Sequence, residues 1–328
     1  MNISRLLTIF ERDLRKWVRD RRGMVLTMAV PLFMPLFGYV LGGEFRDLPI
    51  GVIGKPAGVP SIFVVQEYPD LATARRGIVS GQIYAIVAPE GVYVDNTNPP
   101  IAAYINRAFR NSGLPIKPSW NRDYEYIHFF LPAIIMMTIF ISAYQGGGMP
   151  VVQDKEKGVI AKYLVTPMTR AEFLLGSLLG GLVKCVAPAL LSLGIAIFAL
   201  DGRYTGGGSG IVSILMLMMV STIGFLGLSV WLALQLNYSL YYALGVLFNT
   251  LTIALSGLFY PVESLPRVMQ VVARVNPMTY AIHAARIILM KNGSLLDLPL
   301  DLAYLSLFSA ATLTLGVASL RNYSLETQ

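Results

Sequence analysis

Long apolar runs separated by short polar segments form the main pattern along the chain. A membrane-spanning helix needs about 20 consecutive, mostly apolar residues. Six runs meet this requirement, and we expect spans at residues 24–43, 127–149, 173–200, 211–235, 239–258 and 299–320. The first run is too long for the core of a cleavable signal peptide, so we expect it to be retained as a span. The pattern predicts an all-α polytopic membrane protein with six transmembrane helices.

The first 23 residues have an amphipathic pattern. Apolar residues such as Leu7, Phe10 and Trp17 recur at helical spacing, and most arginines and lysines lie elsewhere on the helix surface. A helix with an apolar stripe, a tryptophan and a basic remainder is typical of the interface of a membrane with anionic lipids. We expect an interfacial amphipathic helix over residues 1–23; the start of an ordinary solvated helix is the alternative.

Residues 44–125 form a polar segment in which short β-like runs alternate with helix-like pieces. Strands are expected near 50–53, 62–65, 83–87 and 92–94, and helices near 70–80 and 100–111. A segment of about 80 residues is long enough to enclose a small core of its own. The sequence therefore predicts a small α/β domain between the first two spans.

Residues 259–293 are only half apolar and contain three prolines. This composition is too polar for a span and too apolar for a free loop, which favours re-entrant half-helices packed against protein. Charged groups are costly there unless they pair, so they form either an outer gate or a structural ion-pair brace. The candidate gate residues are Pro261, Glu263, Pro266, Pro277, Tyr280, His283 and Arg286.

Composition supports the membrane assignment. Hydrophobic residues make up 55% and charged residues 14% of the chain, which leaves too little polar surface for a soluble protein of 328 residues. A net charge of +7 is also typical of nucleic-acid binding, but most of the basic excess lies beside the spans, where it reports topology. We expect no nucleic-acid partner. From the basic residues we expect both termini and 150–172 to lie in the cytoplasm, and six spans then put 44–125 outside the plasma (inner) membrane.

Side chains suited to catalysis or metal binding are scarce. The chain has one cysteine, Cys185, and two histidines, so neither an intrachain disulfide nor a metal site is expected. The phosphate-binding motif Gly-x-x-x-x-Gly-Lys-Ser/Thr is absent from the sequence: "GVIGKPAG" has too short a glycine spacing, and "TGGGSG" lacks the lysine. We expect no catalytic residues and no cofactor bound by this chain.

A charged insert at residues 150–172 separates the second and third spans. Its apolar residues alternate with charges at roughly helical spacing, between Gly158 and Pro167 as helix breakers. We expect a short amphipathic helix parallel to the membrane. Such a helix either covers the lipid surface or is bound by another protein, and its residues leave both possibilities open.

Four segments occur in order along the chain: "RDRRGMVLTMAVPLFMPLFGYVLGG", "NRDYEYIHFFLPAII", "EKGVIAKYLVTPMTRAEFLLG" and "SGLFYPVESLPRVMQVVARVNPMTYAIHAARIILMKNG". Together they resemble the permease subunits of ABC type-2 exporters, in the branch with an external domain between spans 1 and 2. The resemblance extends over nearly all of the chain outside 44–115. It implies a non-catalytic subunit that moves a lipid-like, drug-like or other amphipathic substrate outward along a dimer interface. It also implies a second permease copy or a similar permease, and separate ABC ATPase subunits that bind ATP and Mg.

The resemblance further implies that the insert is the coupling helix that docks on the ATPase. Its matching residues are Asp154, Glu156, Lys157, Gly158, Lys162, Tyr163, Leu164, Thr166 and Pro167. The family usually has an acidic residue where Lys162 stands, so we expect the complementary charge on the partner to differ here.

Polar residues on the second and fifth spans are candidates for the substrate path, as in the family: Thr138, Ser142, Tyr144, Tyr241, Asn249 and Thr252. Hydrogen bonding between helices is an equally good explanation. Lys184 lies either near mid-membrane or at the cytoplasmic interface, which its long side chain can reach.

Two other functions stay open, a membrane-anchored sensor and a secondary transporter or channel without an ATPase. The sequence does not determine the substrate, whether the chain forms a homodimer or a heterodimer, or the role of the external domain.

Overall fold

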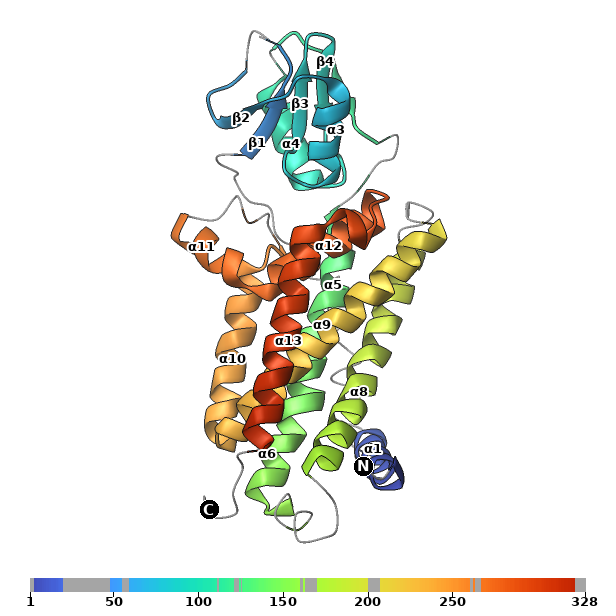
Figure 1. The fold of residues 1–328 in the computed structure, drawn as a ribbon. Coiled ribbons are helices and arrows are strands. Elements are labelled where there is room, and N and C mark those ends of the chain that lie inside the picture. Colours follow the sequence, from blue (N-terminus) through green and yellow to red (C-terminus); the bar gives the residue numbers. More distant parts are fainter. Residues whose placement is uncertain are drawn as a thin grey trace.

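In the computed structural model, a bundle of long helices carries a small β-sheet domain at one end (Figure 1). We call this the sheet end of the bundle, and the opposite end, where α6 finishes, the α6 end. The predicted first span at 24–43 lies outside the described residues. The structure describes residues 3–19, 48–54, 59–110, 112–120, 124, 126–159, 162, 170–199, 207–259, 262 and 267–321.

Four helices in the described part of the chain are long and apolar enough to cross a membrane. They comprise Ile127–Glu156, Gly176–Phe198, Gly207–Gln235 and Pro299–Ser319, which overlap four of the predicted spans. These segments belong to α5 through α6, to α8 (Arg170–Ala199), to α9 (Gly207–Gln235) and to α13 (Pro299–Arg321). A further helix, α10 (Tyr238–Leu255), overlaps the span predicted at 239–258. The chain is therefore a mostly helical, polytopic membrane protein, while the count of six spans stays a prediction.

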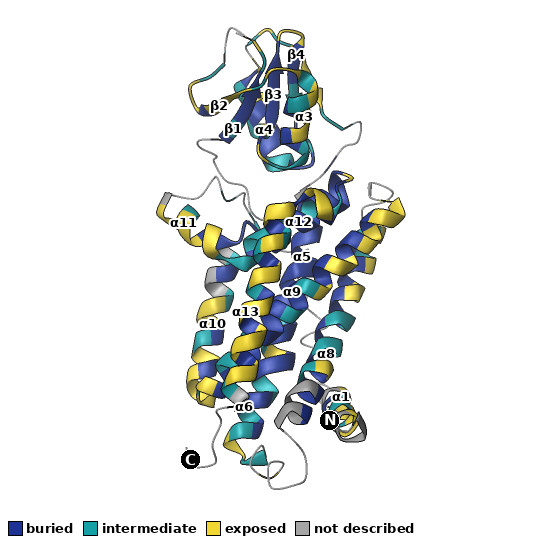
Figure 2. Cartoon of the chain, in the orientation of Figure 1, coloured by how far each residue is buried: buried dark blue, intermediate teal, exposed yellow. Residues whose placement is uncertain are grey.

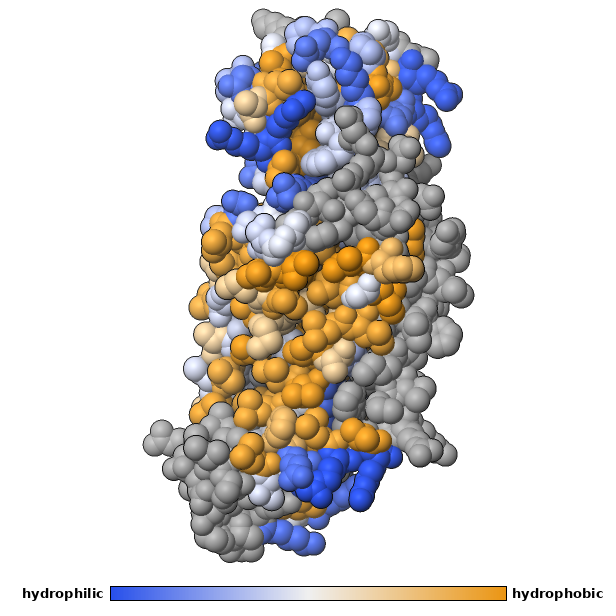
Figure 3. All heavy atoms as spheres, turned by 90° about the vertical axis from the view of Figure 1, so that its right-hand side faces the viewer, coloured by the Kyte–Doolittle hydropathy of each residue, from blue (hydrophilic) through white to orange (hydrophobic). Residues whose placement is uncertain are grey.

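The surface of the bundle is apolar between its two ends. On the face shown in Figure 3, this apolar belt lies between the sheet domain, whose surface mixes hydrophilic and apolar residues, and a hydrophilic patch at the α6 end. Phe198 of α8 and Leu307 of α13 are 87% and 72% exposed, as suits side chains that contact lipid. By contrast, α5 is almost wholly buried inside the bundle (Figure 2). The belt has the character of a surface that faces hydrocarbon.

One continuous helix runs through the centre of the bundle. It consists of α5 (Tyr126–Ser142), the π-helical turn η1 (Ala143–Gly148) and α6 (Met149–Glu156). A Cβ atom on Gly147 would lie 2.2 Å from Leu226 Cδ1, and one on Gly148 would lie 2.0 Å from Tyr241 Oη. Glycine is therefore what permits α9 and α10 to approach this turn so closely.

The amphipathic N-terminal segment forms α1 (Ile3–Arg19), which packs on α8 at the α6 end. Asp13 on its inner face is buried and lies against Gly180, where a Cβ atom would be 3.0 Å from Asp13 Cβ. The helix agrees with the predicted amphipathic element, and its place in the membrane interface stays a prediction.

The half-apolar segment contains two helices, α11 (Arg267–Val275) and α12 (Pro277–Met290), followed by the 3₁₀ turn η3 (Leu295–Asp297). Asn276 separates the two helices, and its side chain accepts a hydrogen bond from the backbone N–H of Met278 at 3.0 Å. Pro277 occupies the first position of α12, where its missing N–H costs nothing. These caps explain why the segment is broken into two short helices.

The sheet domain is a five-stranded sheet with the order β2–β1–β3–β4–β5. β1 is parallel to β2 and β3, β3 and β4 form an antiparallel pair, and β5 is parallel to β4. The strands are β1 (Leu48–Val52), β2 (Phe63–Glu67), β3 (Ala85–Ala88), β4 (Gly91–Val94) and β5 (Ile116–Pro118), and the helices are α3 (Leu71–Val79) and α4 (Pro99–Ala108). β5 was not predicted, because all three of its residues are exposed and it lacks an apolar alternation. The sheet agrees with an α/β domain; its extracytoplasmic location stays a prediction.

Candidate functional site

At the α6 end, the last residues of α6 hold the turn between α9 and α10. Lys155 Nζ donates hydrogen bonds to the carbonyl oxygens of Leu234 and Leu236, at 2.9 and 2.5 Å. Glu156 Oε1 accepts a hydrogen bond from the backbone N–H of Tyr238 at 2.6 Å. We call these bonds the α6 clasp.

The charges of the α6 clasp suit the helix ends that they contact. The last carbonyls of a helix and the first N–H groups lack intrahelical partners and carry opposite partial charges. An ammonium group therefore stabilises the end of α9, and a carboxylate stabilises the start of α10. Asn237 caps α10 as well, because its side chain accepts a hydrogen bond from Leu240 N–H at 2.8 Å. The end of α6 is thus bonded to both α9 and α10.

A buried ion pair connects α1 to α6. The Arg12 guanidinium lies 2.6 Å from an Asp13 carboxylate oxygen and 3.3 Å from one of Asp154, and both carboxylates are buried. Burial strengthens such attractions but makes an unpaired charge costly. The amphipathic helix and α6 therefore share one charge cluster at this end of the bundle.

The predicted coupling residues are only partly covered by the structure. Tyr163, Leu164, Thr166 and Pro167 lie outside the described residues, and Lys157 and Lys162 are exposed. Asp154 and Glu156 end the long central helix instead of belonging to a separate helix that starts at 150. The reason is that η1 carries the helix past the glycines at 146–148. Gly158 then turns the chain with a φ of +66°.

The predicted path residues are divided between several contacts. Thr138 Oγ1 of α5 lies 3.0 Å from Ser192 Oγ of α8, so it joins two helices. The rings of Tyr144 and Tyr241 stack with centroids 4.6 Å apart, and each hydroxyl donates to the backbone carbonyl of the other residue. These three residues form bridges between helices, and a role in the substrate path stays a prediction.

The structure also shows how far the other path candidates and Lys184 are buried. Thr252 is buried, while Ser142 Oγ and Asn249 Oδ1 are buried atoms without a hydrogen-bond partner in the described part of the chain. Lys184 is only 3% exposed, and a Cβ atom on Gly146 would lie 3.2 Å from its Cβ. Lys184 is therefore inside the bundle and does not extend to an exposed interface.

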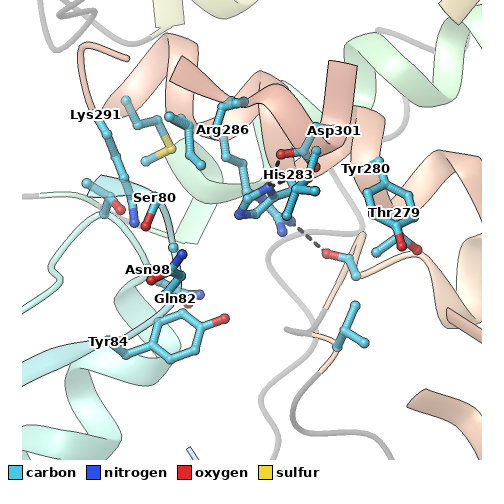
Figure 4. A pocket seen from close by; sticks show the side chains of 18 of the residues that line it. Ser80, Gln82, Tyr84, Asn98, Thr279, Tyr280, His283, Arg286, Lys291 and Asp301 are labelled. Carbon is cyan, nitrogen blue, oxygen red and sulfur yellow. Dashed lines mark hydrogen bonds and ion pairs between the residues drawn. The ribbon is translucent and has the colours of Figure 1, made fainter. Parts of the chain in front are cut away.

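At the sheet end, a cavity of about 570 Å³ lies between the sheet domain and the ends of α12 and α13. Figure 4 shows Gln82, Tyr84 and Asn98 of the sheet domain on one side and His283 with Asp301 on the other. His283 Nδ1 is 3.2 Å from both carboxylate oxygens of Asp301, at the start of α13. The cavity therefore lies between the two parts of the fold.

Three of the gate candidates, Tyr280, His283 and Arg286, line this cavity. Arg286 donates hydrogen bonds to the carbonyls of Phe129, Gly257 and Leu258 at 3.2, 2.8 and 3.0 Å, and its guanidinium lies 3.6 Å from the Phe129 ring centroid. Tyr280 Oη donates to Arg274 O at 2.7 Å and its ring stacks on Tyr304. Pro277 starts α12, whereas Pro261, Glu263 and Pro266 lie outside the described residues. Arg286 therefore connects α12 to α5 and to the residues after α10, and both the outer gate and the ion-pair brace stay predictions.

Lys291 fixes the sheet domain to the bundle, and sequence reasoning missed it. Its Nζ lies 2.6 Å from Asp95 Oδ2 and donates to Ile78 O at 2.7 Å, and both charged groups are buried. The two residues are 196 positions apart, and no local pattern indicates that they pair. A lysine at the end of an apolar helix was the only available signal.

A metal site finds no support in the part of the chain that the structure describes, where no group of three His, Cys, Asp or Glu side chains is suitably placed. Cys185 is a buried free thiol on α8. The expectations of no metal and of no cofactor on this chain stay predictions.

Comparison with known proteins gives one family and several relatives. The family described as ABC-2 type transporter matches residues 4–290. The chain is 25% identical over 209 residues to the probable multidrug ABC transporter permease YbhR of Escherichia coli (strain K12), covering 64% of this chain and 55% of that protein. It is 29% identical over 181 residues to the daunorubicin resistance ABC transporter permease protein DrrB1 of Streptomyces coeruleorubidus, covering 49% and 57%.

A third relative, the probable multidrug ABC transporter permease YbhS of Escherichia coli (strain K12), is 21% identical over 370 residues, covering 97% of this chain and 96% of that protein. The regions matched by this chain span little more than half the length of YbhR and of DrrB1.

Proposed function

Because the chain belongs to the ABC-2 type transporter family, we propose that it is the transmembrane subunit of an ATP-driven exporter of amphipathic, drug-like compounds. The names of its relatives, which mention multidrug permeases and daunorubicin resistance, support this class of substrate. Proteins of this family are generally non-catalytic, and separate subunits hydrolyse ATP. Two ABC ATPase subunits would bind at the α6 end, facing the cytoplasm, below this chain and a second copy or a similar permease.

The α6 clasp is the observation that carries the mechanism. A force that the ATPase applies to the segment after Glu156 reaches α6 first. Lys155 and Glu156 are bonded to the end of α9 and the start of α10, so both helices are displaced with α6. Movement of these helices exchanges inward-open and outward-open states, and the free energy of ATP binding shifts their populations.

The polar bridges inside the bundle fit this scheme. Tyr144 and Tyr241 join η1 to α10 by two hydrogen bonds and a ring stack, one helical turn or more inside the α6 clasp. Tight contacts of this kind transmit displacement because packed interiors have low compressibility. The central helix and α10 therefore move as one unit. No contact among the described residues favours the sensor or channel alternative.

The test uses the full chain, purified with the ATPase subunits that accompany it and reconstituted into vesicles. ATP-dependent uptake of daunorubicin into inside-out vesicles and the ATPase rate are measured together. Lys155→Met should lower uptake by roughly tenfold or more, since it removes two charge-assisted hydrogen bonds, while the ATPase subunits stay bound. Lys117→Met, at an exposed lysine of the sheet domain, is the matched control and should leave uptake unchanged.

Two results would overturn the proposal. The first is a purified chain without any ATPase subunit and without ATP-dependent uptake, which would return attention to the sensor and channel hypotheses. The second is full uptake by the Lys155→Met protein, which would remove the α6 clasp from the mechanism.

A further inference from the structure

The cavity at the sheet end has two buried polar atoms without a hydrogen-bond partner in the described residues. They are Asn98 Oδ1 in the sheet domain and Ser256 Oγ just after α10, and these residues are 6% and 1% exposed. Both residues line the cavity. Buried polar groups are almost always hydrogen-bonded, because an unpaired one costs about 1–3 kcal/mol. Two such atoms in the wall of one cavity therefore point to a group that binds between them.

The local sequence explains why each atom is free. Asn98 precedes α4 at the N-cap position but makes no capping bond. The next two residues, Pro99 and Pro100, have no N–H to donate. Ser256 ends α10, and its hydroxyl does not bond back to the preceding helical turn, unlike Ser309 and the threonines of α13.

The cavity has a size and a lining that suit an organic ligand. Its volume of about 570 Å³ lies within the range of about 300–1,000 Å³ that is typical of small-molecule sites. Phe129, Ile287, Met290 and Leu298 form an apolar part of the wall, and Gln82, Tyr84 and Thr279 add polar groups. A ligand with an apolar body and a polar edge matches both parts.

Ion pairs hold the cavity wall rigid, and they do not favour a ligand of either charge. Asp95 is paired with Lys291 and Asp301 with His283, so these buried carboxylates already have partners. Lys291 also fixes the sheet domain over the end of α12. The two unpaired oxygens then decide the chemistry: Asn98 Oδ1 can only accept a hydrogen bond, and the Ser256 hydroxyl can accept one as well as donate one. A ligand that donates hydrogen bonds to both oxygens would supply the partners that they lack among the described residues.

From these observations we infer that the cavity is a binding site for an amphipathic compound with an apolar ring body and hydrogen-bond donors that reach Asn98 and Ser256. This inference deepens the proposed function, on which it rests for the source of the ligand. The site lies within one chain, between the sheet domain and the bundle, on the side of the molecule opposite to the α6 clasp.

The test measures protection of one cysteine by one probe, rhodamine 6G, a cationic dye with a flat aromatic ring body and two N–H donors. Gln82→Cys is introduced together with Cys185→Ala, because Gln82 is exposed and lines the cavity. The rate of reaction with a water-soluble maleimide is compared with and without saturating rhodamine 6G. We expect the probe to slow labelling at least fivefold. Gln66→Cys, at an exposed glutamine of β2 outside the cavity wall, is the control and should react at the same rate in both conditions.

A second measurement tests the two oxygens directly. Ser256→Ala and Asn98→Leu should each raise the dissociation constant of rhodamine 6G by about three- to tenfold, the worth of one hydrogen bond. Ser119→Ala is the matched control: its hydroxyl is also buried without a partner among the described residues, but Ser119 does not line the cavity. This variant should bind the probe normally.

The results separate the site from the proposed function. Equal labelling of the Gln82→Cys protein with and without the probe would overturn the site. If daunorubicin uptake persisted in that case, the exporter function would stand without the cavity. Protection of Gln82→Cys in a protein that shows no ATP-dependent uptake would support the site and remove the exporter function.

Discussion

Toward the α6 end of the bundle, helices touch through glycines and through side chains that bond to backbone groups, whereas at the sheet end side chains from two parts of the fold enclose a cavity. At the first end, Gly147 and Gly148 leave no room for a Cβ atom, and Lys155 and Glu156 satisfy the ends of the neighbouring helices. At the second end, Asn98 and Ser256 keep buried oxygens without partners in the described structure.

The difference separates two mechanical properties within one chain. A region without empty space transmits a displacement, because its atoms cannot be compressed. A region with a cavity can accept a guest while its frame stays in place. Substitutions at the two ends should therefore have different consequences, and the following predictions compare them from the largest expected effect to the smallest.

The largest effect is expected for Lys291→Met at the sheet end. The change leaves the Asp95 carboxylate buried without its cation, which should lower the free energy of unfolding by about 3–5 kcal/mol. Unfolding in mixed detergent micelles measures this change. Adding Asp95→Asn should restore much of the loss, because the buried charge is then removed as well. Equal stability of the Lys291→Met protein and the original protein would show that the pair does not hold the sheet domain.

A smaller effect is expected for Gly148→Ala in the tightly packed region. The new methyl group would lie 2.0 Å from Tyr241 Oη and 2.5 Å from Ser229 O, so the helices must separate. Such overpacking typically costs about 1–3 kcal/mol. Gly194→Ala on α8 is the control, since no atom lies within 4 Å of its Cβ position. If both variants unfold alike, the contact at Gly148 is looser than the structure indicates.

The smallest effect is expected for Thr138→Val, between the two ends. It removes the hydrogen bond between Thr138 and Ser192, and bonds of this kind inside membrane proteins contribute about 0.6 kcal/mol on average. Stability should fall slightly and daunorubicin uptake should stay unchanged, because Thr138 bridges two helices. A large loss of uptake at normal stability would instead assign Thr138 to the substrate path.

Patterns that repeat along the chain were predictable from the sequence. The apolar runs indicated the long helices, the amphipathic repeat indicated α1, and the alternating segment indicated a sheet domain, because each depends on residues close together in sequence. Asn276 and Pro277 likewise give local signals for a helix start, and α12 begins there. The ABC-2 family was identified in the same way, from four ordered segments.

The cavity and the α6 clasp were not predictable. Asp95 meets Lys291 only because the sheet domain folds over α12, and Glu156 meets Tyr238 only because α6 ends beside α10. Contacts between distant segments leave no periodic signal in a single sequence. The position of Lys184 was left open for a related reason: its burial against Gly146 depends on the packing of α8 on η1.

The π-helical turn at Ala143–Gly148 also sets the rotational phase of everything that follows it. One extra residue in a helix turns the next segment by about 100° around the axis. The face of α6 that presents Lys155 and Glu156 is therefore not continuous with the face that the α5 repeat predicts. Deleting a single glycine from the 146–148 run would keep the helix and its composition, yet it would rotate Lys155 away from the carbonyls of Leu234 and Leu236. The connection to α9 and α10 thus depends on a count of residues as much as on their identity.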